Sequence, residues 1–292
     1  MRRWCVMLLG MLGFSSFLFQ SAFASGLDFW PDFLNQLQFT HDDARPQVQY
    51  FIRQDAGRLD IIQSELDHAQ YTLPYVVKTL RARQMPVDLA LLPFIESGYL
   101  PSAQSDVGAT GIWQLMPITA RSYGYDVENP WVDPMNNIVL STQIAMDNLA
   151  ELHREFGGWY LALAAYNAGP GTVMGVIRLA ADRHESLNYW NLALPYQTRD
   201  YVPRLLAMSY ILRHAAAFHL RLPPITLYNR AVLITLPKQL SIQQIIRDAQ
   251  IPVGLFEYLN PGFSWDYTPP WRTQILLPPV NVWAFDHDYY RE

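Results

Sequence analysis

Cysteine is almost absent from this chain. The single cysteine among its 292 residues is Cys5, which lies in a predicted targeting segment. If that segment is removed, the remaining chain can form neither disulfides nor a cysteine-ligated metal site, so its stability must come from packing. Half of the residues are hydrophobic and 14% are aromatic, which is enough to bury a sizeable core.

Positive charge is also scarce. The chain has 21 lysines and arginines against 26 aspartates and glutamates, and no basic block stands out. Nucleic acids are bound by such blocks, so nucleic acid is not an expected partner. The sequence also lacks a His-Glu-x-x-His helix, a Walker loop and a Gly-x-Ser-x-Gly elbow. We therefore expect no metal site and no cofactor.

The first 24 residues have the organisation of a secretory signal peptide. Two arginines precede an uncharged apolar stretch at 7–19, which is followed by the small-x-small site Ala22-Phe23-Ala24. An uncleaved membrane anchor is the alternative, because no charge appears between the arginines and Asp28. We predict cleavage after Ala24, since glycines and polar residues interrupt the apolar stretch.

The remaining chain divides into three parts. Residues 25–85 predict a lead-in followed by two supporting helices with a bend near Leu73-Pro74. Residues 86–222 continue the helical pattern and form a second predicted unit, which is also helical. Residues 225–292 have the order strand, helix, helix, strand. We therefore predict a mainly α protein with a small α+β C-terminal appendage.

A carboxylate interrupts the most apolar helix of the middle part. Residues 88–97 predict a short helix, which Gly98 ends and which carries Glu96 in its last turn. Burial and the negative end of the helix dipole both disfavour an ionised carboxylate, so the pKa of Glu96 should be raised. A carboxyl that is protonated near neutral pH can act as a general acid. Taken alone, however, a glutamate at a helix end is more often a plain surface residue.

Two further segments have candidate binding groups. Gly108 and Gly111 permit a tight loop before Trp113 and Gln114, and an aromatic face and an amide are common sugar-binding groups. Tyr166-Asn167 follows at the end of an apolar helix. Taken one at a time, the first segment is more often a simple turn and the second a helix C-cap.

Together, these segments resemble a known enzyme family. Glu96-Ser97, the string Gly-Ala-Thr-Gly-Ile-Trp-Gln-Leu-Met at 108–116 and the string Ala-Ala-Tyr-Asn-Ala-Gly at 164–169 occur in the order typical of the soluble-lytic-transglycosylase family. The longer strings at 86–97 and 197–203 are similar to its membrane-bound lytic murein transglycosylase D branch. The resemblance implies a lysozyme-like helical domain with a groove for the glycan strands of peptidoglycan.

The resemblance also implies roles for individual residues. It makes Glu96 the single catalytic acid and base. It assigns substrate binding to Ser97, Ser105, Gln114, Met116, Tyr166, Asn167 and Gln197. Gln197 departs from the family, which usually has glutamate before Thr-Arg at this place, and this puts the local charge in question.

The implied reaction cleaves the β-1,4 bond between N-acetylmuramic acid and N-acetylglucosamine and leaves 1,6-anhydro ends. Two alternatives stay open. A hydrolytic muramidase would use Asp106 as a second carboxylate, although an aspartate beside a glycine turn is more often a turn residue. A non-catalytic peptidoglycan-binding protein would keep the groove without turnover.

The C-terminal part and the location complete the predictions. Residues 225–292 contain short strings at 234–238, 240–246, 259–261 and 275–278 that resemble a single degenerate LysM module. This resemblance implies glycan binding, and a structural cap on the helical domain is the alternative. The signal peptide and the family together imply a periplasmic protein whose partner is peptidoglycan. Membrane contact is expected only if the signal stays uncleaved.

Overall fold

The computed structural model of the chain describes residues 29–226 and 228–289. The predicted signal peptide, its cleavage site and Cys5 lie outside these described residues. Among the described residues, no helix is both long enough and apolar enough to cross a membrane.

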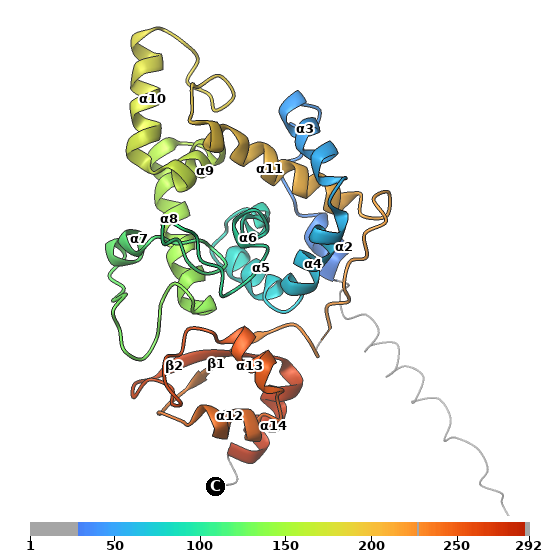
Figure 1. The fold of residues 1–292 in the computed structure, drawn as a ribbon, viewed down its shortest axis with the longest axis vertical. Coiled ribbons are helices and arrows are strands. Elements are labelled where there is room, and N and C mark those ends of the chain that lie inside the picture. Colours follow the sequence, from blue (N-terminus) through green and yellow to red (C-terminus); the bar gives the residue numbers. More distant parts are fainter. Residues whose placement is uncertain (1–28, 227, 290–292) are drawn as a thin grey trace, which may run out of the picture.

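Helices build the larger part of the molecule, which fills the upper part of Figure 1. In chain order they are α2 (Phe29–Leu34), α3 (Pro46–Asp55), α4 (Leu59–Ala69), α5 (Leu73–Ala82), the 3-10 helix η1 (Val87–Leu91), α6 (Leu92–Ser97), α7 (Pro117–Ser122), α8 (Ile138–Phe156), α9 (Trp159–Ala168), α10 (Pro170–Asp182) and α11 (Tyr196–Arg213). We call these elements the helical body.

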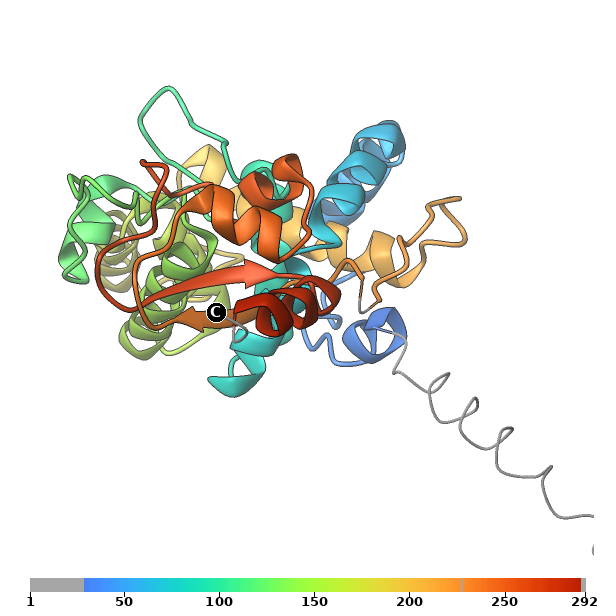
Figure 2. The same cartoon turned by 90° about the horizontal axis from the view of Figure 1, so that it is seen from below.

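A smaller C-terminal unit follows. Its elements are β1 (Val232–Leu236), α12 (Ile242–Asp248), α13 (Val253–Leu259), β2 (Thr273–Leu277) and α14 (Pro279–Tyr289). The strands pair antiparallel with Ile234 opposite Ile275, and Figure 2 shows them side by side. The predicted mainly α fold class is confirmed, and the order strand, helix, helix, strand is as predicted. The likeness to a LysM module stays a prediction, and α14 was not predicted.

The supporting helices differ from their prediction in one place. A break near Leu73-Pro74 is confirmed, and Pro74 lies in the first turn of α5, where its missing N–H leaves no hydrogen bond unmade. The prediction of only two helices in this region was wrong, because a second break separates α3 from α4 and gives three helices. Residues 56–58 are all exposed, so no buried face sustains the helix there.

The two longest helices, α8 and α11, have defined ends. Helix α8 begins at Ile138, because the side chain of Asn137 accepts hydrogen bonds from the N–H groups of Val139 and Leu140 and caps the helix. Helix α11 ends at Arg213, and the chain continues in turns to residue 219.

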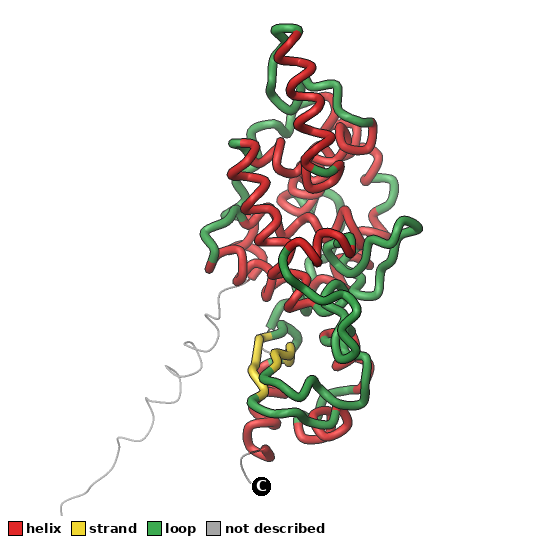
Figure 3. Tube along the Cα trace, turned by 90° about the vertical axis from the view of Figure 1, so that its left-hand side faces the viewer, coloured by secondary structure: helices red, strands yellow, loops and turns green. Residues whose placement is uncertain are grey.

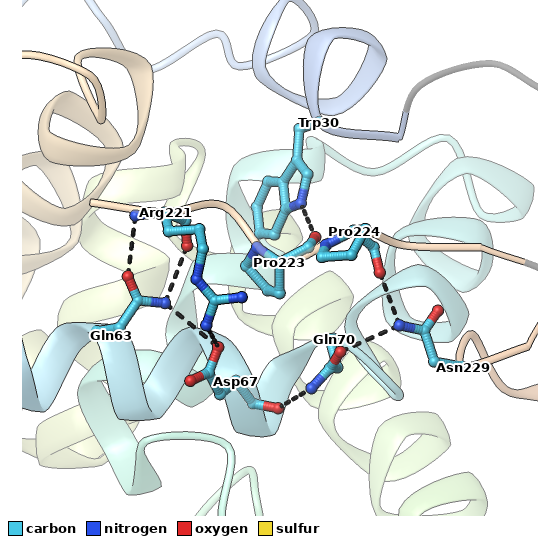
Figure 4. A network of polar contacts seen from close by, with 8 residues as sticks. All are labelled: Trp30, Gln63, Asp67, Gln70, Arg221, Pro223, Pro224 and Asn229. Atoms are coloured by element: carbon cyan, nitrogen blue, oxygen red, sulfur yellow. Dashed lines mark hydrogen bonds and ion pairs between the residues drawn. The ribbon is translucent and has the colours of Figure 1, made fainter. Parts of the chain in front are cut away.

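The linker between the helical body and the C-terminal unit is bound to the helical body at Arg221, Pro223 and Asn229 (Figure 4). Gln63 and the backbone of Arg221 exchange two hydrogen bonds of 2.9 Å. The indole N–H of Trp30 donates to the carbonyl of Pro223 at 2.7 Å. The amide of Asn229 donates to Gln70 at 3.0 Å. These contacts fix the linker against α2 and α4.

The C-terminal unit packs directly below the helical body (Figure 3). Buried hydrophobic residues form one cluster that extends from Trp30 to Phe285 and so includes both parts. Backbone contacts cross the junction as well: the N–H of Asp133 donates to the carbonyl of Gly262 at 2.8 Å, and Val132 forms a bridge with Phe263. The two parts therefore share a core.

Candidate active site

Glu96 stands near the end of a short helix that is anchored in the core. The first three residues of α6 are buried, and the predicted stop at Gly98 is confirmed. Gly98 has a left-handed φ of 59°, and its N–H donates to the carbonyl of Phe94. The first half of the helix predicted over 88–97 is instead the 3-10 helix η1, and Glu96 lies in the α-helical second half, α6.

The Glu96 carboxyl is half-buried and has one side-chain partner. The hydroxyl of Tyr201, on α11, donates a hydrogen bond to its Oε1 atom. Burial raises the pKa of Glu96 from 4.5 to about 7, and the Tyr201 hydrogen bond opposes this rise. Near neutral pH the group is therefore poised either to give up a proton or to accept one.

Two tyrosines surround this carboxyl. Tyr166, from α9, donates to the backbone carbonyl of Trp113 at 2.8 Å. Burial is the first reason that the pKa values of Tyr166 and Tyr201 are raised, and the charge of Glu96 raises both further. Both hydroxyls thus keep their protons and can donate hydrogen bonds. The predicted substrate-binding role of Tyr166 stays a prediction, and Tyr201 was not singled out from the sequence.

A proline in α11 explains how Tyr201 is placed. Pro203 has no N–H to donate to the carbonyl of Arg199, so that carbonyl needs another partner. The hydroxyl of Tyr189 lies 2.8 Å from it and 2.9 Å from the carbonyl of Thr198. Tyr189 therefore ties down the turn of α11 that carries Tyr201.

Asn167 follows Tyr166 and is exposed. Its Oδ1 atom accepts a hydrogen bond of 2.9 Å from the hydroxyl of Thr198. This bond joins the end of α9 to the first turn of α11 and fixes the orientation of the Asn167 amide.

The loop before α7 is held together by two of the predicted binding residues. The Ser105 hydroxyl accepts the N–H of Ala109 at 2.9 Å. The Gln114 amide donates to the carbonyl of Gly111 at 2.9 Å and to that of Ala103 at 3.2 Å. Both side chains are only partly buried, so each can brace the loop while facing solvent on one side.

Ser97 joins α6 to the same loop. Its hydroxyl donates to the carbonyl of Ile112 at 3.0 Å, which sets the loop beside Glu96. Met116 is half-buried and lies just before α7.

Trp113 does not offer the sugar-stacking face considered from the sequence. Its side chain is fully buried, and its indole N–H donates to Thr142 of α8 at 3.0 Å. The ring is a core residue, because the loop folds back onto α8. The contribution of Trp113 to the site is its backbone carbonyl, which orients Tyr166.

Gln197 is exposed in the first turn of α11, four residues before Tyr201. Residues four apart lie on the same face of a helix, so Gln197 is a neighbour of Tyr201. Its side chain takes no part in the hydrogen bonds described around Glu96. Asp106 is exposed in the turn of the loop, as expected for a turn residue.

A cavity of about 220 Å³ adjoins Glu96. Beside α6, it is lined by charged side chains that the sequence did not single out: Asp55, Arg58, Glu65 and Arg204. Asp55 and Arg58 form an ion pair of 3.4 Å. A larger cavity of about 800 Å³ near Trp159 has none of the predicted site residues in its lining.

Glu65 is the unusual member of this cavity. One of its carboxylate oxygens is buried without a hydrogen-bond partner, and burial raises its pKa from 4.5 to about 7. A signal was present in the sequence: Glu65 lies on the same face of α4 as the buried residues Ile62, Leu66 and Ala69. An acid on an apolar helix face therefore pointed to this position.

The chain is similar to known proteins that are named as lytic transglycosylases. Residues 76–188 match the family model described as the transglycosylase SLT domain. Over 240 residues, 82% of this chain, the sequence is 31% identical to membrane-bound lytic murein transglycosylase D of Escherichia coli strain K12, of which 52% is covered. The predicted resemblance to this family is thereby confirmed.

Two further matches are more distant. The soluble lytic murein transglycosylase of the same strain is 30% identical over 163 residues, which are 51% of this chain and 24% of that protein. The solved structure of the 70 kDa soluble lytic transglycosylase from Escherichia coli matches with 26% identity and a TM-score of 0.39 over 49% of this chain and 24% of that one. The present chain spans about half the length of the D-type relative.

Proposed function

On the premise that residues 76–188 are a transglycosylase SLT domain, we propose that this protein is a lytic transglycosylase acting on the glycan strands of peptidoglycan. The observation that carries the proposal is the half-buried Glu96 carboxyl. Burial raises its pKa to about 7, and the Tyr201 hydroxyl donates a hydrogen bond to it. The bond that the enzyme would cleave is the β-1,4 linkage between N-acetylmuramic acid and N-acetylglucosamine.

The reaction needs one carboxyl in two successive roles. Protonated Glu96 gives its proton to the glycosidic oxygen as the bond between that oxygen and C1 breaks. The N-acetyl group of the substrate stabilises the positive charge that develops at C1. Ionised Glu96 then takes the proton of the C6 hydroxyl, whose oxygen attacks C1 and closes the 1,6-anhydro ring. No water is consumed, and Glu96 ends in its starting state.

The surrounding residues suit these two roles. The Tyr201 hydroxyl can donate to the ionised carboxylate and so stabilise it between the two steps. Burial of the carboxyl favours the protonated form that the first step requires. Tyr166 and Asn167, whose side chains are oriented by Trp113 and Thr198, would hold the sugar beside Glu96. Ser97, Ser105, Gln114 and Met116 would line the groove.

Product analysis tests this proposal. Purified sacculi are digested with the protein, and the soluble fragments are separated and identified by mass spectrometry. Fragments with 1,6-anhydromuramic ends are expected. Fragments with reducing ends alone would instead identify a hydrolase, and the absence of soluble fragments would favour a binding protein.

A hydrolytic muramidase is the second candidate, and one observation favours it. Glu65 lines the same cavity as Glu96 and could activate a water molecule there as a second carboxylate. If so, Glu65→Gln should abolish reducing-end products. Under the transglycosylase mechanism the same variant should still release anhydro-ended fragments.

We place the protein in the periplasm, with peptidoglycan as its partner. The predicted signal peptide supports export, and the D-type relative is named as membrane-bound and as acting on murein. Fractionation of cells that express the full chain tests the location, with release by osmotic shock as the expected result.

A further inference from the structure

The chain turns sharply directly after the helix that carries Glu96. Gly98 and Tyr99 both have a φ of 59°, in the left-handed region. Glycine adopts this region without strain, but a bulky residue such as Tyr99 does so at a cost and must be held there by its surroundings. Tyr99 is fully buried, and its hydroxyl donates to the carbonyl of Ala90 at 2.7 Å. This contact holds the side chain of the turn.

The backbone of the turn is held from the C-terminal unit. Tyr258 of α13 places its hydroxyl 3.0 Å from the carbonyl oxygen of Tyr99 and 2.9 Å from that of His68, in the last turn of α4. The one hydroxyl proton is thus shared between two carbonyls. The Tyr258 ring also packs edge-on against Tyr71, with 5.8 Å between ring centroids. Burial raises the pKa of Tyr258, so the hydroxyl keeps its proton.

Helix α4 also contacts the turn directly. A Cβ atom placed on Gly98 would lie 3.0 Å from the Cγ atom of Glu65, so α4 and the turn are in close contact. Glu65 and His68 are three residues apart on α4 and therefore lie on neighbouring positions of one face. By bonding to both His68 and Tyr99, Tyr258 fastens α4 and the turn to each other.

We propose that Tyr258 is a positioning residue of the active site, which acts through the backbone of the Gly98–Tyr99 turn to set the direction in which Glu96 enters its cavity. The C-terminal unit then helps to set the geometry of the active site. This inference rests on the proposed role of Glu96, and it assigns to Tyr258 no contact with the substrate.

The test is Tyr258→Phe, which removes one oxygen and keeps the ring against Tyr71. A catalytic group that is displaced slightly loses much of its effect, so kcat on soluble glycan fragments should fall roughly 10- to 100-fold. KM should change little, because the groove itself is untouched. The pKa of Glu96, measured by NMR of its carboxyl carbon, should fall toward 4.5 as water reaches the loosened carboxyl.

Tyr123→Phe is the matched control, since it removes a hydroxyl that donates to Glu151 between α7 and α8. It should leave kcat and the Glu96 pKa unchanged. If Tyr258→Phe lowers the melting temperature but leaves both of these quantities as in the wild type, Tyr258 is merely structural and the inference is wrong. If the wild type cleaves no glycan, the proposed function fails, and the NMR titration alone still decides whether Tyr258 positions Glu96.

Discussion

Glu96 and Glu65 are two carboxyls whose pKa folding raises from 4.5 to about 7, with burial as the first cause in both cases. Each binds its proton more tightly in the folded than in the unfolded protein. The resulting stabilisation is complete below about pH 4.5 and is lost as the pH rises through about 7. Near neutral pH the folded protein is therefore less stable than it would be with both carboxyls protonated, but these carboxyls can titrate there.

This linkage predicts a pH-dependent effect of Glu96→Gln on stability. Above about pH 7 the variant avoids burying a charge and should be more stable than the wild type by on the order of 1–3 kcal/mol. The difference should shrink toward zero near about pH 4, where the wild-type carboxyl is protonated. Urea unfolding at both pH values measures it, and a pH-independent difference would contradict the burial of Glu96.

The same substitution should abolish the release of 1,6-anhydro fragments. Glutamine keeps the shape of the side chain, but it can neither donate a proton to the glycosidic oxygen nor take one from the C6 hydroxyl. General acid–base catalysis is typically worth about 10²–10⁴-fold, and here one residue serves twice, so the loss should be at or beyond the upper end. Asp106→Asn is the control, and it should retain most activity because Asp106 is exposed in a turn.

Gln197→Glu tests the departure from the family pattern. A carboxylate one helical turn before Tyr201 would add a like charge near Glu96 and raise its pKa further. The loss of activity on the alkaline side should then move to higher pH. Because position 197 is exposed, solvent screens this charge and the shift should be small. An unmoved pH profile would mean that the screening is complete.

At the scale of elements, the loop before α7 depends on close contact with the segment before α8. Gly111 has a φ of 76°, and a Cβ atom there would lie 2.2 Å from the carbonyl oxygen of Met135. Gly111→Ala should therefore destabilise the protein by about 3 kcal/mol or more, which lowers the melting temperature by roughly 6–12 °C.

Gly175→Ala is the matched comparison for this prediction. Gly175 lies inside α10, and nothing lies within 4 Å of a Cβ atom placed on it. Alanine should stabilise the helix there by about 0.5–1 kcal/mol. Calorimetry measures the melting temperature of both variants. A decrease for Gly111→Ala but not for Gly175→Ala would show that the close contact at Gly111 causes the loss of stability.

At the scale of the whole molecule, the junction between the two parts supports the cap among the roles considered for the C-terminal unit. The shared core, the bound linker and Tyr258 all join this unit to the helical body. A chain that ends at Leu222 would expose the apolar face that the unit covers. We expect such a chain to be poorly soluble or much less stable, and to lose turnover even on short soluble glycans.

Sedimentation and turnover assays on the shortened chain measure this outcome. A glycan tether would behave differently: without it, the chain would stay soluble and cut short glycans, but bind sacculi less well. That result would restore the role implied by the LysM likeness and argue against a structural cap.

The residues of the site differ in how far the sequence alone could identify them. The helix that carries Glu96, its stop at Gly98 and the order of elements from β1 to β2 follow from local signals, namely apolar spacing and the allowed φ of glycine. The family motifs pointed to Tyr166 for the same reason, because each motif is contiguous in the chain. These features need no knowledge of how the helices pack.

Other features arise from packing between distant segments. Tyr201 reaches Glu96 across 105 positions, and Tyr258 reaches Tyr99 across 159. Trp113 looked like a binding residue in the sequence, but the core covers its ring. Local spacing determines which face of a helix is apolar, whereas the partner of that face depends on how all helices pack together at once. For this reason the sequence singled out Glu96 as the candidate acid, and the tertiary structure decided its pKa, its partners and its orientation.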